Sequence, residues 1–252
     1  MARIVAVHSF RGGTGKSNVT ANLAALLAAA GHRVGVVDTD IQSPGIHVLF
    51  GFDPQGAPHS LNDFLWGRCD IAQTAYDVTP AVGSPAGEGR LYLIPSSIRS
   101  GDIARVIHDG YDIQLLKDGY RQLIGGLPLD FLFIDTHPGL NEETLLSIAL
   151  ADILIILLRP DQQDYQGTAV TVEVSRHLEV PEMYLVINKV PAGFSREALE
   201  AKVASTYGCE VVGVLPHADE LMVLGSAGLF VVRYPDHPVS QELRAIVRRI
   251  GG

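Results

Sequence analysis

The sequence predicts a doubly wound, three-layer α/β/α domain with a mostly parallel β-sheet, and two patterns carry this prediction. First, six short runs are apolar at nearly every position, which is typical of parallel strands covered on both faces. Second, segments with apolar residues at helical spacing lie between these runs, and such β-α alternation builds a doubly wound sheet. With 47% hydrophobic and 19% charged residues, the 252-residue chain has ample material for a core.

The expected strands follow one another at residues 4–8, 33–38, 131–135, 153–158, 184–188 and 211–216. A Gly-rich turn separates the first strand from a helix in which Val19, Leu23 and Leu27 share one face, and Gly31 stands where that helix should end. Further helices are expected at residues 60–66, 141–149, 162–178, 195–206, 218–226 and 239–250.

We expect residues 1–252 to form a single domain. A segment at about residues 51–95 interrupts the alternation, because it contains much of the chain's Pro and Gly, as in "GFDPQGAPH" and "TPAVGSPAGEG". We interpret this segment as an elaboration at the edge of the sheet rather than a second domain, and its "SPAGEGR" stretch as a mobile surface turn.

Charge and cysteine usage exclude several classes of protein. The 28 acidic and 19 basic residues give a net charge of -9, which argues against bulk polyanion binding. Cys69 and Cys209 are far apart in sequence and form no CxxC pair or disulfide framework. The N-terminus is not a signal peptide, and Asp152 interrupts the longest apolar run at about half the length of a membrane span. We therefore expect a cytoplasmic protein.

The Gly-rich turn "RGGTGKS" is the first candidate binding element. Glycines at 12, 13 and 15 allow backbone N–H groups to converge on an anion, and the following helix adds the positive end of its dipole. Lys16 would then contact the β- and γ-phosphates of a nucleotide, and the Ser17 hydroxyl would bind Mg²⁺. The alternative is a strand-to-helix turn with an incidental lysine.

Carboxylates follow two of the other expected strands. Asp38 and Asp40 leave the second strand at the edge where open α/β sheets bind ligands, and there they could hold the water shell of Mg²⁺ and orient an attacking water. Asp135 ends the strand "FLFID" and suits contact with Mg²⁺ through water, while Gly139 allows its loop to move toward a γ-phosphate. Asp also commonly ends strands and caps turns, so each signal is weak alone, whereas the three elements together indicate a Mg-nucleotide site.

In succession, "RGGTGKS", "VVDTDIQSPG", "FLFIDTHPG", "LVINKV" and "GVLP" resemble the ParA/MinD family of ATPases, the deviant Walker A class of P-loop proteins. The resemblance covers nearly the whole chain and is weakest at residues 51–90. It implies a P-loop NTPase fold of the SIMIBI type that binds ATP and Mg²⁺. This class writes its loop as K-G-G-x-G-K-[ST], so Phe10, which stands where the usual pattern requires glycine, fits the class.

The resemblance assigns roles to individual residues. Lys16, Asp40 and Asp135 are the expected catalytic residues, with Arg11 acting in trans, since it occupies the position of the signature lysine that reaches the partner's phosphates in a nucleotide-sandwich dimer. The alternative for Arg11 is a solvated loop residue. The expected nucleotide-binding residues are Gly12, Gly13, Thr14, Gly15, Lys16, Ser17, Asn18, Asn188 and Pro216.

Within that set, the family pattern implies that the Asn188 amide contacts the adenine edge and that Pro216 lines the adenine pocket. Ordinary turn positions at the ends of strands are the alternatives for both residues. For the metal, Ser17 is expected to bind Mg²⁺ directly, and Asp38 and Asp135 through water.

Function follows from the resemblance as three hypotheses. The leading one is a slow ATPase switch that forms an ATP-dependent homodimer, responds to an activator or adaptor protein, and positions a plasmid, a chromosome region or a protein assembly. The second is a nucleotide-binding regulator with little or no hydrolysis, and the third is a small-molecule ligase or synthetase of the same fold. The isolated Cys69 and Cys209 argue against nitrogenase iron proteins and iron–sulfur carrier ATPases, which need paired or clustered cysteines.

The last expected helix, residues 239–250, has an apolar stripe flanked by Arg244, Arg248 and Arg249. In the family that the motifs resemble, the last helix of the domain body follows "GVLP" by about this distance, so we expect a helix of the domain body rather than a membrane-surface helix. Its arginines are a candidate for non-specific DNA contact. Among the remaining residues, His8 is expected in the core, His137 in a loop, and "RPDQQD" either at a dimer interface or as a helix cap.

Overall fold

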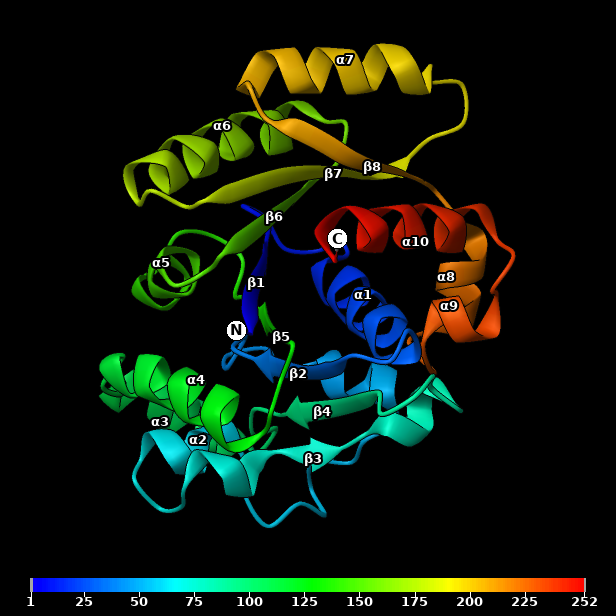
Figure 1. Ribbon diagram of the computed structural model, residues 1–252. Helices are drawn as coiled ribbons and strands as arrows, with labels where there is room; N and C mark the ends of the chain where they lie inside the picture. Colours follow the sequence, from blue (N-terminus) through cyan, green and yellow to red (C-terminus); the bar gives the residue numbers. More distant parts are fainter. Residues whose placement is uncertain (1, 252) are drawn as a thin grey trace.

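In the computed structural model, which describes residues 2–251, one eight-stranded sheet has helices on both faces (Figure 1). The strand order is β3-β4-β2-β5-β1-β6-β7-β8, and within it only the edge strand β3 runs antiparallel to its neighbour. The strands are β1 (Arg3–His8), β2 (Arg33–Asp38), β3 (Tyr76–Asp77), β4 (Arg90–Ile94), β5 (Phe131–Asp135), β6 (Ile153–Leu158), β7 (Glu182–Val190) and β8 (Glu210–Pro216). The predicted fold class and all six predicted strands are confirmed.

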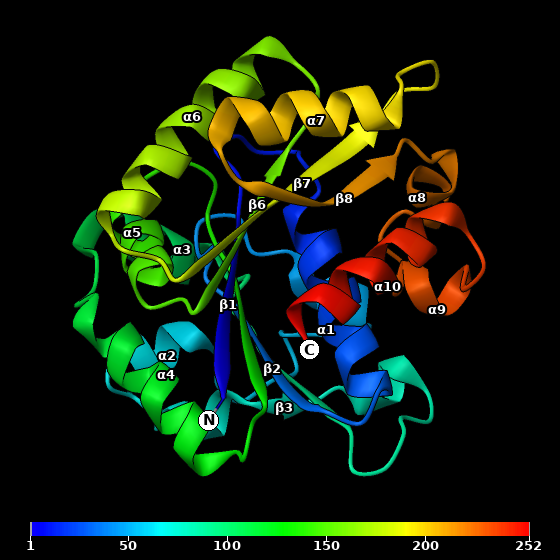
Figure 2. The same cartoon turned by 45° about the horizontal axis from the view of Figure 1, so that its top comes forward.

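The helices cover the two faces of the sheet. They are α1 (Lys16–Ala29), α2 (Leu61–Leu65), α3 (Ser100–Asp109), α4 (Gln114–Gly126), α5 (Glu142–Ala149), α6 (Gln162–His177), α7 (Arg196–Tyr207), α8 (Asp219–Leu224), α9 (Phe230–Arg233) and α10 (Pro238–Ile250). Figure 2 shows α1 and α10 side by side on one face, with α5 and α6 on the other. Alternate strand residues serve opposite faces: Val5 and Val7 pack with α1, whereas Ala6 packs beneath α5, α6 and α7.

Helix α10 belongs to the body of the domain. Its buried residues, which include Val239, Leu243 and Ile246, pack against α1 and β8. Helix α1 is consequently buried on most of its circumference, more than the single apolar face in its sequence predicts. Within residues 2–251, no helix has the length and apolar character that crossing a membrane requires.

Strands β3 and β4 and the two amphipathic helices α3 and α4 were not predicted from the sequence. Strands β3 and β4 extend the sheet beyond β2, and they lie in the Pro- and Gly-rich segment at residues 51–95. The same segment holds Trp66, the only tryptophan of the chain. The guanidinium groups of Arg68 and Arg105 lie 4.7 and 4.4 Å from the centre of its ring system.

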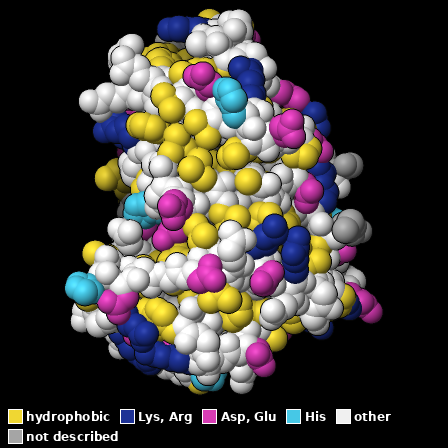
Figure 3. Space-filling model, turned by 90° about the vertical axis from the view of Figure 1, so that its left-hand side faces the viewer, with side chains coloured by type: hydrophobic (Ala, Val, Ile, Leu, Met, Phe, Trp, Pro, Cys, Tyr) yellow, Lys and Arg dark blue, Asp and Glu magenta, His cyan; other side chains and the backbone are white. Residues whose placement is uncertain are grey.

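The side of the molecule that carries α5 and α6 is partly apolar. Figure 3 shows hydrophobic side chains gathered in a band across the upper half of this side. Close to the Gly-rich turn, Phe10 and Val170 line one hollow with Arg11 and have 37% and 46% of their surface accessible.

Candidate functional site

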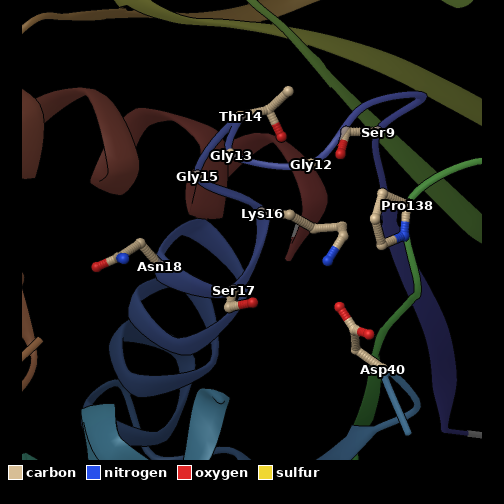
Figure 4. A pocket seen from close by; sticks show the side chains of 10 residues that line it. All are labelled: Ser9, Gly12, Gly13, Thr14, Gly15, Lys16, Ser17, Asn18, Asp40 and Pro138. Carbon is tan, nitrogen blue, oxygen red and sulfur yellow. The ribbon is translucent and has the colours of Figure 1, made fainter. Parts of the chain in front are cut away.

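The site forms where the central strands end. β5 lies between β1 and β2, and its last residue, Asp135, pairs with Val7 on one side and Asp38 on the other. The loops that follow these three strands therefore meet at one edge of the sheet. There they enclose a cavity of about 200 Å³ (Figure 4), lined by Ser9, Gly12, Gly13, Thr14, Gly15, Lys16, Ser17, Asn18, Asp40 and Pro138.

The Gly-rich turn has the backbone shape of an anion-binding loop. Gly13 and Gly15 have φ angles of 76° and 97°, a left-handed conformation that favours glycine. Gly15 immediately precedes α1, and the first turn of this helix contains no acidic residue. The positive end of the α1 dipole therefore faces the cavity without an internal counter-charge, which suits a phosphate group.

Side chains of opposite charge point toward each other across this cavity. Figure 4 shows Lys16 reaching in from the start of α1 and Asp40 from the loop after β2, with the Ser17 hydroxyl beside them. Lys16 is only 7% exposed, and its Nζ lies 3.4 Å from Asp135 Oδ1. Thr20 Oγ1 donates to the same Asp135 oxygen at 3.3 Å.

Asp135 fits the expected link to a metal. Its Oδ2 atom is buried and has no hydrogen-bond partner, and burial raises the pKa of this carboxyl, although Lys16 acts in the opposite direction. Water from the shell of a hard cation such as Mg²⁺ would satisfy this oxygen, and Ser17 would provide a direct oxygen ligand. The residues present therefore fit a Mg-nucleotide.

Asp38 is fully buried and organises the loop that carries Asp40. Its carboxylate accepts hydrogen bonds from the backbone N–H groups of Asp40 at 3.1 Å and Gly45 at 3.2 Å. Burial raises its pKa well above the usual range, and the neighbouring Asp135 and Asp40 raise it further. Asp38 does not line the cavity, whereas Asp40 does, and the Asp40 carboxylate is held by His137 at 2.6 Å.

Arg11 lies outside the cavity in a cluster of charged residues. Its Nη1 is 3.4 Å from Asp164 Oδ1 and 3.6 Å from Asp161 Oδ1. Arg159 binds the same Asp164 through its Nε, at 3.0 Å. Burial alone would raise the pKa of Asp164, but the hydrogen bonds from Arg159 and the charge of Arg11 lower it. Part of "RPDQQD" thus binds Arg11, while Asp161 also caps α6.

Phe10 packs on α6 directly beside this cluster. A Cβ atom added to Gly167 would lie 2.2 Å from the ring of Phe10, so the contact depends on glycine.

The two residues predicted to contact adenine lie in different surroundings. The Asn188 side chain donates to the carbonyl oxygen of Thr14 at 2.7 Å. Pro216 lines a separate, mostly apolar hollow of about 310 Å³ together with Val190, Pro191 and Phe194. Lys189, which follows Asn188 in "LVINKV", was not predicted as a site residue, yet its Nζ donates to the carbonyl oxygen of Gly13 in the Gly-rich turn.

His8 is a core residue, as expected. Its Nδ1 lies 2.9 Å from the Thr136 hydroxyl, and its Nε2 is buried without a hydrogen-bond partner. Burial, followed by the charges of Lys16 and His137, lowers the pKa of His8 to about 3, so this imidazole is neutral at physiological pH.

A Gly-rich turn between β1 and α1 that ends in Lys16-Ser17, with carboxylates from adjacent strands, defines a P-loop nucleotide-binding protein. The family described as the CobQ/CobB/MinD/ParA nucleotide binding domain matches residues 5–230, and the chain belongs to this family. This membership confirms the family resemblance predicted from the sequence motifs.

Individual relatives cover most of the chain. An uncharacterized ATP-binding protein of Methanocaldococcus jannaschii is 28% identical over 253 residues, covering 100% of this chain and 89% of the relative. An iron–sulfur cluster carrier protein of the same organism is 29% identical over 263 residues, covering 98% of this chain and 83% of the relative.

Solved structures have the same fold. The septum site-determining protein MinD complexed with Mg-ADP from Pyrococcus horikoshii superimposes with a TM-score of 0.81 at 21% identity, over 99% of this chain and 96% of that one. A chain of the MinC:MinD cell division protein complex of Aquifex aeolicus gives a TM-score of 0.82 at 18% identity, over 100% of this chain and 96% of that one.

Proposed function

We propose that this ATP-binding protein is a slow ATPase that works as a dimerisation switch. The observation that carries the proposal is that the Lys16 and Asp40 side chains line one cavity at the positive end of α1. In this proposal the triphosphate lies against the N–H groups of the turn, and Lys16 binds the β- and γ-phosphates. Ser17 would hold Mg²⁺ directly and Asp135 would support it through water, whereas Asp38, which does not line the cavity, would act by holding the loop that carries Asp40. When bound, Mg²⁺ neutralises charge on the phosphate oxygens.

Asp40 would hold the hydrolytic water. The water oxygen would bond to the γ-phosphorus as the bond from that phosphorus to the β–γ bridging oxygen breaks, which releases ADP with the bridging oxygen. The Asp40 carboxylate would accept a hydrogen bond from the attacking water and orient it, and the proton that the water loses would end on the released phosphate. The adenine base would lie toward the apolar hollow that contains Pro216 and Phe194.

Dimerisation would bring Arg11 to the partner's phosphates. Arg11 is at the nucleotide-bearing edge, with 39% of its side chain exposed, and its neighbours Phe10 and Val170 offer exposed apolar surface for a second subunit. By analogy with the MinC:MinD complex, a second protein would bind the ATP-loaded dimer and link it to a cargo.

We do not extend the iron–sulfur name of a relative to this chain. Cys69 packs beside the core under α2 and α4, whereas Cys209 belongs to the core under α6 and α7. Between residues 2 and 251, no group of three or more His, Cys, Asp or Glu side chains is arranged to hold a metal ion. C-terminal Arg249 binds Glu210 with two hydrogen bonds of 2.9 Å, which weakens the case for DNA contact by that helix.

Phosphate release and molar mass in solution test the proposal. The wild-type chain should release phosphate slowly and form dimers with ATP but not with ADP. Lys16→Ala should lose ATP binding, and Asp40→Ala should bind ATP but lose about 100-fold or more in turnover. Lys202→Ala, an exposed change on α7, is the matched control.

Three outcomes would contradict the proposal. ATP-bound monomers that turn over would exclude the dimer. Tight binding without phosphate release would favour the non-hydrolysing regulator, and hydrolysis that depends on a metabolite would favour the ligase.

A further inference from the structure

We infer that Asn188 and Lys189, at the end of β7, are positioning residues that hold the phosphate-binding turn in its anion-binding shape. This inference rests on the proposed nucleotide site. Asn188 Nδ2 donates to the carbonyl oxygen of Thr14 at 2.7 Å, and Lys189 Nζ donates to that of Gly13 at 2.8 Å. Two side chains from one strand end therefore bind two consecutive carbonyl groups of the turn, about 175 residues away in sequence.

The carbonyl groups of Gly13 and Thr14 need donors because the N–H groups of the turn are directed at the bound anion. A turn that binds an anion directs N–H groups at it, so the C=O groups must point elsewhere and find donors of their own. The left-handed conformations of Gly13 and Gly15, on either side of Thr14, allow the N–H groups to face the anion while the C=O groups face away from it. Without Asn188 and Lys189, the freed carbonyl oxygens would allow peptide units to rotate and present negative charge to the phosphate.

Asn188 is committed to this contact by its surroundings. Only 6% of the residue is exposed, and its Oδ1 accepts a hydrogen bond from the backbone N–H of Lys189 at 2.8 Å. The Asn188 amide therefore donates through Nδ2 and accepts through Oδ1, and each of these hydrogen bonds requires the same orientation of the amide. A Cβ atom at Gly15 would lie 2.4 Å from Asn188 Nδ2, so the amide packs directly on the turn. It does not line the hollow that contains Pro216.

The backbone at Lys189 supports the same role. Lys189 has a φ angle of 56°, a left-handed conformation that residues other than glycine rarely adopt. The pairing of β7 with β8 shifts register between Ile187 and Val190, which frees Lys189 from the regular ladder. A strained backbone conformation persists only where surrounding contacts hold it. At Lys189 the left-handed conformation places the side chain in contact with the carbonyl oxygen of Gly13.

Binding of a base-free ligand distinguishes this role from adenine recognition. Dissociation constants for Mg-ATP, Mg-GTP and Mg-tripolyphosphate would be measured on the full chain. Asn188→Ala should weaken all three about tenfold and Lys189→Ala about three- to tenfold, each by a common factor, since a lost hydrogen bond acts on the phosphate site. Lys189→Arg should retain most affinity, and Lys202→Ala should match wild type.

The outcomes distinguish a failure of the positioning role of Asn188 and Lys189 from a failure of the proposed nucleotide-binding function. If Asn188→Ala weakens only ATP and leaves tripolyphosphate unchanged, Asn188 recognises the base and the inference is wrong. Unchanged affinities in Lys189→Ala, checked by circular dichroism for a wild-type fold, would also overturn it. A wild-type chain that binds neither ATP nor tripolyphosphate would instead contradict the proposed function. If Asn188→Ala does not fold, the Lys189 pair of variants decides alone.

Discussion

His137 Nδ1 lies 2.6 Å from Asp40 Oδ1, so a single hydrogen bond joins the loop after β5 to the loop after β2. The two residues are 97 positions apart in sequence. Because the imidazole occupies one carboxylate oxygen, the other remains for the cavity that Asp40 lines. His137 thereby fixes the orientation of the side chain proposed to hold the hydrolytic water.

Removing this contact should slow turnover without weakening nucleotide binding. We expect His137→Ala to lower the rate of phosphate release about tenfold, because a hydrogen bond to a charged group contributes roughly 1.5–3 kcal/mol. His137→Asn, whose amide can donate from a similar place, should recover part of the loss. Steady-state phosphate release and ATP titration check both variants. Equal loss of ATP affinity would indicate a general distortion of the site instead.

Mixed dimers test whether Arg11 acts on the partner's phosphates. Arg11→Ala and Asp40→Ala should each abolish hydrolysis alone. In an equal mixture, about half of the dimers should contain one subunit of each variant. In each of these dimers the site with an intact Asp40 would receive Arg11 from the other subunit, while the second site would stay inactive. About a quarter of the wild-type rate should therefore return. Phosphate release from the mixture is the measurement. No recovery, although an affinity tag on one variant co-purifies the other as a heterodimer, would mean that Arg11 acts only within its own subunit.

The buried His8 should make stability depend on pH. Folding lowers the pKa of His8 from 6.5 to about 3. Between these values the unfolded chain binds a proton that the folded chain does not, so the free energy of unfolding falls as the pH falls. The loss from this group should reach about 2 kcal/mol between pH 7 and pH 5.

Urea unfolding of wild type and His8→Asn at several pH values isolates this contribution, since the other titrating groups are common to both. The difference in unfolding free energy between wild type and His8→Asn should change by about 2 kcal/mol between pH 7 and pH 5. A constant difference would show that another group causes the acid sensitivity.

Gly167→Ala should destabilise the protein, because the new Cβ atom would lie 2.2–2.7 Å from three atoms of Phe10. Overpacking of this kind costs about 1–3 kcal/mol, and a helical glycine replaced without a clash would instead gain stability. Gly125→Ala in α4, where nothing lies within 4 Å of the new atom, is the matched control. Urea unfolding should show that adding Phe10→Ala to Gly167→Ala removes most of the penalty. An additive double variant would contradict the contact.

Local sequence patterns predicted the central strands and the Gly-rich turn. They did not predict elements whose structure depends on contacts with residues far away in the sequence. Strand β4 was missed because exposed Arg90 and half-buried Tyr92 alternate with buried Leu91 and Leu93, unlike the continuous apolar runs elsewhere. Asp40 could be found because it follows a strand at the ligand-binding edge.

The partners of the site residues could not be predicted in this way. Nothing in the sequence around His137 or Lys189 indicates Asp40 or Gly13, since each contact depends on how distant loops meet at the sheet edge. Such pairs follow from the strand order, which the alternation of strands and helices left open.

Trp66, whose ring is contacted by Arg68 and Arg105, gives the protein a single tryptophan as a fluorescence probe. Its emission reports the core cluster under α2 and α4, on the side of the sheet away from β7 and β8, while circular dichroism averages over the whole chain. If the fluorescence transition in urea precedes the dichroism transition, this cluster melts first and unfolding is not two-state. Coincident transitions would show that the Pro- and Gly-rich segment folds cooperatively with the nucleotide-binding core.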